Sequence, residues 1–197
     1  MKTHQRVVCV SIALMLAVGS STTIAQAPAA RTPAASTHAA NVDMAEVRRL
    51  AREPVETIFS GAPIGRVSDA DYWQTVQGSP KPVVVVFYAN QDEQSRHLAT
   101  LIRYIALEFS GSVAFYGYRV TAGATVEHSA LAALEKRYKV KQVPATLFYD
   151  NDHGKMELEK TEYSVPAVIE YRTPRPLLWT TYHQRVRKYI QDHIISH

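Results

Sequence analysis

Apolar runs separated by short polar or turn-forming stretches indicate a chain in which strands and helices alternate. Val83 to Phe87 is unbroken and mostly β-branched, which predicts a strand that is buried on both faces of a sheet. Ser95 to Phe109 has apolar residues at helical spacing and predicts an amphipathic helix. The apolar stripe of this helix consists of Leu98, Leu101, Ile102, Ile105 and Phe109. The centre of the protein is therefore expected to be a sheet with helices packed on it.

The flanking segments continue the alternation. A helix is expected to start at Ser68-Asp69-Ala70-Asp71 and to end at the Gly78-Ser79-Pro80-Lys81-Pro82 turn. The other predicted elements are a strand over Val113–Val120, a helix over Ser129–Tyr138, a strand over Ala145–Tyr149, a hairpin turn at Asp150–Gly154, a strand over Lys155–Leu158 and a helix over about Leu177–Ile194. The expected order is β–α–β–α–β–α–β–β–α.

The first 27 residues have the features of a secretory signal peptide. Lys2 and Arg6 form a positive start, Val7 to Val18 is apolar or small, and Ala25-Gln26-Ala27 suits signal cleavage. We therefore expect a signal peptide over residues 1–27 and a protein that is periplasmic or secreted. If the segment is retained instead, it would anchor the protein in the membrane.

Two further segments precede the region of alternating elements. Residues 28–41 are rich in Ala, Pro, Thr and Ser, which predicts a flexible linker. Residues 42–63 predict a helical extension, with Asp43 as its cap and a break or kink at Pro54. Its apolar positions are Met44, Val47, Leu50, Ala51, Val55 and Ile58. The main domain is then expected to cover residues 64–197.

Composition excludes one class of function and argues against another. The 197 residues contain one cysteine, Cys9, within the expected signal peptide, so residues 28–197 contain no thiol. Thiol–disulfide exchange needs an attacking thiolate and is excluded for that segment. The whole chain has 22 basic and 18 acidic residues, and removal of residues 1–27 would leave 20 and 18. This near balance does not favour nucleic acid as a partner.

The sequence contains no strong motif for a cofactor, a metal or a catalytic triad. The histidines do not have the close spacing of common metal ligands, and Asp150-Asn151-Asp152 lacks the rest of a calcium loop. Ser95 is not part of a Gly-x-Ser-x-Gly turn, and no Gly-rich phosphate loop is present. We therefore expect no cofactor, no metal and no catalytic residue.

Two segments resemble the two halves of a thioredoxin active site. Val83 to Ala89 resembles the strand that leads into the family's Trp-Cys-Gly-Pro-Cys-Lys motif, and Gln142 to Tyr149 resembles the loop with its cis-proline and the following strand. The motif position itself reads Gln91-Asp92-Glu93-Gln94-Ser95-Arg96, without cysteine. Val86 stands where the catalytic members carry a buried acid.

The resemblance implies an α/β, three-layer thioredoxin-like fold, with a central mixed sheet flanked by helices and an extra N-terminal helix. It also implies a cis Val143–Pro144 peptide bond. The degenerate site would consist of Gln91, Asp92, Glu93, Gln94, Ser95, Val143 and Pro144. Asp92 and Ser95 align with the two cysteines. Asp92 is either an ordinary helix N-cap or a carboxylate that mimics the charge of a thiolate.

The resulting expectation is an exported, redox-inactive protein that binds other proteins and is not an enzyme. Its partner would be an extended peptide or an envelope protein, as for an adaptor or chaperone-like component of an envelope assembly. The alternatives are an enzyme that uses non-thiol residues at the degenerate site and a membrane-tethered structural module. The long segment Tyr163 to Pro176 has no equivalent in the minimal fold and is the most individual surface.

Overall fold

The computed structural model describes residues 42–152, 155–166, 168 and 178–196, all of which belong to one unit, His38–His197. The expected signal peptide and linker, residues 1–27 and 28–41, lie outside the described residues, as does most of the Tyr163–Pro176 segment. No helix in the described parts of the chain is long and apolar enough to cross a membrane.

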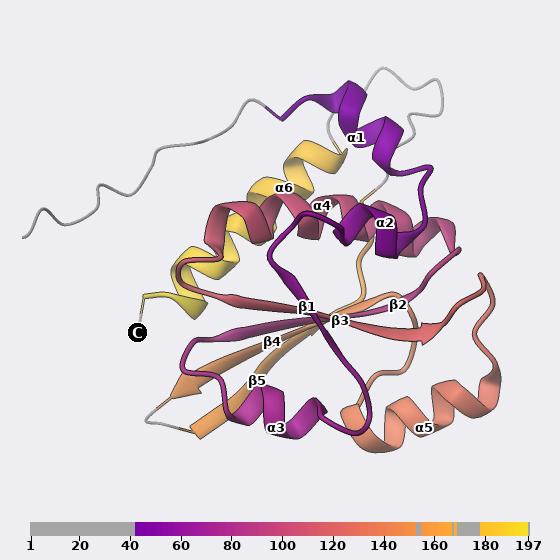
Figure 1. Ribbon diagram of the computed structural model, residues 1–197. Coiled ribbons are helices and arrows are strands. Elements are labelled where there is room, and N and C mark those ends of the chain that lie inside the picture. Colours follow the sequence, from indigo (N-terminus) through magenta and orange to yellow (C-terminus); the bar gives the residue numbers. More distant parts are fainter. Residues whose placement is uncertain (1–41, 153–154, 167, 169–177, 197) are drawn as a thin grey trace, which may run out of the picture. The chain divides into compact units, whose positions relative to one another are not determined.

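The order of elements is the predicted one (Figure 1). The elements are α1 (Met44–Leu50), α2 (Val55–Phe59), β1 (Ile64–Val67), α3 (Tyr72–Gln77), β2 (Val83–Ala89), α4 (Glu93–Phe109), β3 (Ala114–Thr121), α5 (His128–Tyr138), β4 (Ala145–Asp152), β5 (Lys155–Glu162), α6 (Leu178–Tyr189) and a π-helix, η1 (Ile190–Ile194).

The five strands form one mixed sheet in the order β1-β3-β2-β4-β5. β1, β3 and β2 are parallel, whereas β4 is antiparallel to β2 and β5 is antiparallel to β4. β2 lies in the middle of the sheet and all seven of its residues are buried, as the β-branched run predicts. β1 and β5 are the edge strands.

Helices cover both faces of the sheet, which gives three layers. In Figure 1, α1, α2, α4 and α6 lie on one side of the sheet, and α3 and α5 on the other. Successive residues of β2 therefore point into different cores: Val84 and Val86 pack with α4, and Val83 and Val85 pack with Tyr72 of α3. This is the thioredoxin-like arrangement that the sequence predicts.

The N-terminal extension consists of two short helices. The Asp43 Oδ1 accepts the Ala45 N–H at 2.8 Å and caps α1, as expected. The helix ends before Pro54, which is the N-cap of α2. The Val55 N–H then donates to the Asn90 carbonyl at 3.1 Å, so α2 is attached to the loop that follows β2.

The β4–β5 hairpin is longer than predicted. Strand pairing continues through Asp152 opposite Lys155, so residues 150–152 are not part of the turn, and β5 extends to Glu162 instead of Leu158. The polar residues that suggested a turn lie at the end of β4 and belong to the strand because Asp150, Asn151 and Asp152 pair with Glu157, Met156 and Lys155 of β5. The last helix is also irregular, since α6 ends at Tyr189 and a π-helix follows.

Candidate functional site

The loop between β2 and α4 is held by backbone and side-chain hydrogen bonds. The Asp92 Oδ2 accepts the Ser95 N–H at 2.7 Å, so Asp92 is the N-cap of α4, one of the two roles expected for it. The Asp92 N–H donates to the Ala89 carbonyl at 3.2 Å, and the Gln91 N–H donates to the Gly123 carbonyl at 3.1 Å. The start of α4 therefore has a fixed position at the carboxyl end of β2.

Ser95 has a different role from the surface residues of the predicted site. Its side chain is fully buried, and its Oγ accepts the Ala89 N–H at 3.2 Å. Gln91, Glu93 and Gln94 are exposed. A partner could touch these three side chains directly, but Ser95 could act only by holding the end of β2 against the helix.

The other predicted segment lies at the same end of the sheet. Ala145 of β4 pairs with Phe87 of β2, and Pro144 is the residue directly before Ala145. The Val143–Pro144 peptide bond is cis, as expected. Val143 is half-buried and Pro144 is buried. Among the described residues, no backbone hydrogen bond uses the Val143 N–H or C=O.

The loop before Val143 is held by hydrogen bonds to Tyr163, the first residue of the Tyr163–Pro176 segment. The Tyr163 hydroxyl donates to the Lys139 carbonyl at 3.1 Å and accepts the Lys141 N–H at 3.0 Å. Lys139 adopts a left-handed conformation with φ 62° at the end of α5. The predicted insertion therefore begins with a residue that fixes one side of the candidate site.

His97 is a buried titratable group beside this site that the sequence analysis missed. It lies in the first turns of α4 and is 8% exposed, and its Nε2 has no hydrogen-bond partner among the described residues. The Glu93 Oε1 is 3.8 Å away. Burial lowers the pKa of His97, and this outweighs the opposite effect of Glu93. A sequence offers no signal for an uncharged, buried histidine on an amphipathic helix.

Removal of the Asp92 cap should weaken α4 measurably. Asp92→Ala is expected to lower the free energy of unfolding by about 1 kcal/mol, because the Ser95 N–H loses its acceptor. Asp92→Asn should cost clearly less, since Asn caps a helix nearly as well. Urea denaturation of the three proteins tests this. Equal losses from both substitutions would mean that the charge, and not the cap, is what stabilises the helix start.

Acid should destabilise the fold through His97, which is buried, and His183, which is half-buried. Burial lowers the pKa of both His97 and His183 below their usual value of 6.5. The unfolded chain then takes up protons first as the pH falls through about 6.5, so stability is complete above that pH and is lost below it. We expect His97→Leu to reduce the loss of stability between pH 7.5 and pH 5, as measured by denaturation at each pH.

His128→Gln is the control for the pH experiment, because His128 is exposed at the start of α5. This change should leave the pH dependence as it is in the unmodified protein. A loss of stability that is the same in His97→Leu as in the unmodified protein would assign the acid sensitivity to other groups.

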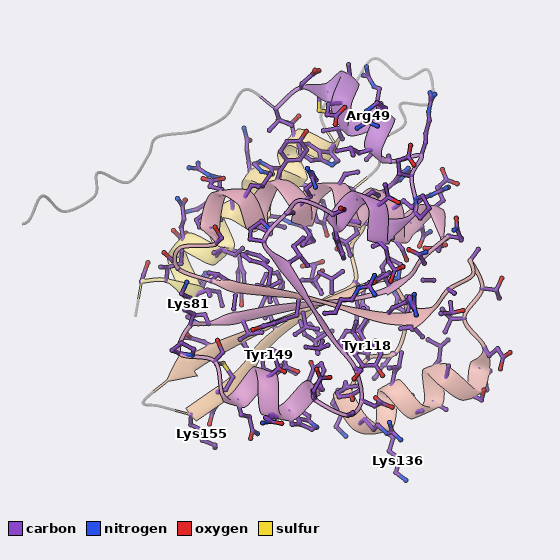
Figure 2. All side chains as sticks on the ribbon, viewed as in Figure 1. Arg49, Lys81, Tyr118, Lys136, Tyr149 and Lys155 are labelled. Carbon is purple, nitrogen blue, oxygen red and sulfur yellow. The ribbon has the colours of Figure 1, made fainter. Side chains whose placement is uncertain are left out.

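A tyrosine cluster lies on the face of the sheet that α3 and α5 cover, where Figure 2 labels Tyr118 and Tyr149. The Tyr72 and Tyr149 hydroxyls are 2.7 Å apart and hydrogen-bonded to each other. Tyr118 and Tyr138 both donate to the Asp69 Oδ1, at 2.5 and 2.7 Å.

Arg137 pairs with the second oxygen of Asp69. The hydrogen bond from Tyr118 contributes most to lowering the pKa of Asp69. The eleven tyrosines of the chain were the only signal of this cluster in the sequence.

No group of three or more His, Cys, Asp or Glu side chains in the described ranges is arranged to hold a metal ion. No protein-family model and no curated protein matches the chain. Among solved structures, it is similar to a thioredoxin from Trichomonas vaginalis, at 19% identity and a TM-score of 0.40; the match covers 52% of this chain and 86% of that one.

Proposed function

We propose that this protein binds an extended polypeptide at the degenerate thioredoxin site and performs no disulfide chemistry there. The observation that carries the proposal is that the Val143 N–H and C=O have no backbone hydrogen bond to a described residue and lie at the same end of the sheet as the exposed Gln91, Glu93 and Gln94. A peptide in extended conformation can pair with such groups as an added strand. The main chain of the peptide would supply affinity, and the side chains of α4 would supply selectivity.

The side chains at this site favour binding over catalysis. The two positions that align with the family's cysteines hold a helix cap, Asp92, and a buried serine, Ser95, and the only cysteine of the chain is Cys9. An enzyme that used Asp92, Ser95 and Arg96 is less well supported, because the Ser95 Oγ is buried and bonded to the Ala89 N–H. The Asp92 cap and the hydrogen bond of the Ser95 Oγ both serve to fix the start of α4.

The expected setting is an exported protein that acts as an adaptor or chaperone-like component of an envelope assembly. This part of the proposal is supported by the signal-like residues 1–27 and by the linker-like residues 28–41. The intact mass of the protein recovered from the exported fraction would distinguish cleavage from a retained membrane anchor. A mass that still includes residues 1–27 would favour the membrane-tethered module.

Site-specific photo-crosslinking in the producing cells tests the binding site. A photoreactive amino acid at Gln91 or Gln94 should give defined adducts of higher mass, because both positions are exposed at the end of the sheet where the Val143–Pro144 loop lies. The same amino acid at Lys136 is the control, since Lys136 is exposed on α5, at a distance from the sheet (Figure 2). Adducts of equal yield from all three positions would contradict a specific site at α4.

A further inference from the structure

A cavity in the described part of the chain lies outside the residues of the degenerate site. It has a volume of about 420 Å³ and opens beside the carboxyl ends of the parallel strands β1, β3 and β2. Arg66, Gly117, Arg119 and Tyr88 line it from these three strands, and Glu56 lines it from α2. Ligands of open α/β sheets commonly bind at this end of parallel strands.

Two arginines in this cavity meet at one carboxylate. The Glu56 Oε1 is 2.7 Å from the Arg66 Nη2 and 2.9 Å from the Arg119 Nη1. Both arginine side chains are substantially exposed, and each guanidinium has further N–H groups that can donate. Glu56 therefore holds the guanidinium groups of Arg66 and Arg119 side by side, and this arrangement suits bidentate binding of an oxyanion.

Tyr88 supplies a third possible donor in this cavity. Its side chain is 1% exposed and lines the cavity, and its hydroxyl forms no hydrogen bond with any other described residue. The hydroxyl is not one of the fully buried, unpaired polar atoms of the described residues, so it is in contact with the cavity and can donate to a group bound there. Burial raises the pKa of Tyr88 to about 12, and the hydroxyl is therefore a donor at neutral pH.

The acidic side chains of the cavity are already bonded within the protein. Asp69 accepts hydrogen bonds from Tyr118, Tyr138 and Arg137. The Asp71 Oδ1 accepts both the N–H and the hydroxyl of Ser68, each at 2.7 Å. The arginines and the Tyr88 hydroxyl, by contrast, retain donors that can reach a bound group.

Gly117 leaves room for two aromatic rings next to this cavity. A Cβ at this position would be 3.1 Å from ring atoms of both Phe59 and Tyr88, which meet edge to face. The glycine thus allows the two rings to approach the strand beside the arginines.

We propose that this cavity binds the oxyanion of a small organic carboxylate or phosphate, held by Arg66, Arg119 and the Tyr88 hydroxyl in place of Glu56. The bound group would receive donors from β1, β2 and β3 at once. Glu56 would act as an internal competitor that occupies the arginines until the ligand displaces it. The site is separate from the peptide site proposed beside Val143.

Titration of the full chain with inorganic phosphate or acetate, followed by amide NMR at constant ionic strength with chloride as the reference anion, tests the proposal. Saturable shifts of the Gly117 and Arg119 amides are expected with at least one of the two anions. The anion that binds more tightly identifies the ligand class as phosphate or carboxylate. Shifts no larger than those from chloride would overturn the proposal.

Substitutions separate the proposed site from general attraction of anions. Arg119→Gln should weaken binding about tenfold, and Tyr88→Phe about fivefold, because each removes a donor. Arg49→Gln is the matched control, since Arg49 lies on α1 outside the cavity (Figure 2), and it should leave binding unchanged. An equal loss from Arg49→Gln would overturn the proposal.

Glu56→Gln gives the sharpest test because it should strengthen binding, by about threefold, when the competing charge is removed. The bond from the Glu56 N–H to the Asn90 Oδ1 uses the backbone and remains in this variant. Weaker binding in a variant that melts at the same temperature as the unmodified protein would show that Glu56 supports the ligand instead of competing with it, and would overturn the proposal.

Discussion

Tyr72→Ala should lower the free energy of unfolding by about 3–5 kcal/mol, the usual cost of truncating a large, buried aromatic side chain. Tyr72 is fully buried at the centre of the tyrosine cluster, and its ring lies 4.3 Å from that of Tyr138 and 5.9 Å from that of Phe87. Its loss would open a cavity where α3 packs on the sheet. Urea denaturation followed by circular dichroism gives the change.

A pair of conservative substitutions tests the hydroxyls of this cluster separately. Tyr72→Phe leaves the Tyr149 hydroxyl buried without the partner it has at 2.7 Å, and should cost about 1–3 kcal/mol. Tyr149→Phe should cost a similar amount. The double variant should cost much less than the two together, because it leaves no unpaired hydroxyl. Fully additive costs would contradict the direct bond between the two tyrosines.

Trp179→Ala should have the second large effect, also about 3–5 kcal/mol, because this side chain attaches α6 to α4. Trp179 is 2% exposed, and its indole N–H donates to the Thr100 Oγ1 at 3.1 Å. The ring stacks on His183 at 5.2 Å and meets Tyr104 edge to face. Thermal and urea denaturation of the variant measure the loss.

Trp73→Ala is the control for this substitution. Trp73 lies on α3 and is 46% exposed, so its removal should cost clearly less than that of Trp179. Trp179→Phe should also cost less than Trp179→Ala, since most of the ring contact remains. Equal losses from Trp73→Ala and Trp179→Ala would mean that α6 contributes little to the stability of the domain.

The sequence predicts the sheet core and the start of α4 well, for local reasons. The β-branched run of β2 can be buried on both faces only in the middle of a sheet, and the periodicity of α4 fixes its buried side. Asp92 precedes that helix at a position where a carboxylate caps it in most contexts. The rest of the candidate site, Val143 and Pro144, was predicted because the segment Gln142–Tyr149 resembles the cis-proline loop of thioredoxins.

The parts that could not be predicted depend on contacts between distant residues. Arg66, Tyr88 and Arg119 have no local pattern in common and meet because β1 and β2 both pair with β3. Glu56 joins them from α2, which is bonded to Asn90 after β2. The same applies to Asp69, which meets Tyr118 and Tyr138 through the fold alone. The hairpin was misjudged because its polar residues resemble a turn when their strand partners are not known.

The charges on β5 determine how this sheet behaves in a concentrated solution. β5 is an edge strand and carries Lys155, Glu157, Glu159, Lys160 and Glu162 over eight residues. A second sheet that approached this edge would have to desolvate these charges before its backbone could pair with β5. Natural proteins use charged edge strands in this way to prevent edge-to-edge aggregation. The hairpin is thus protected by its own composition, and substitutions that neutralise β5 would promote aggregation even where they leave the fold intact.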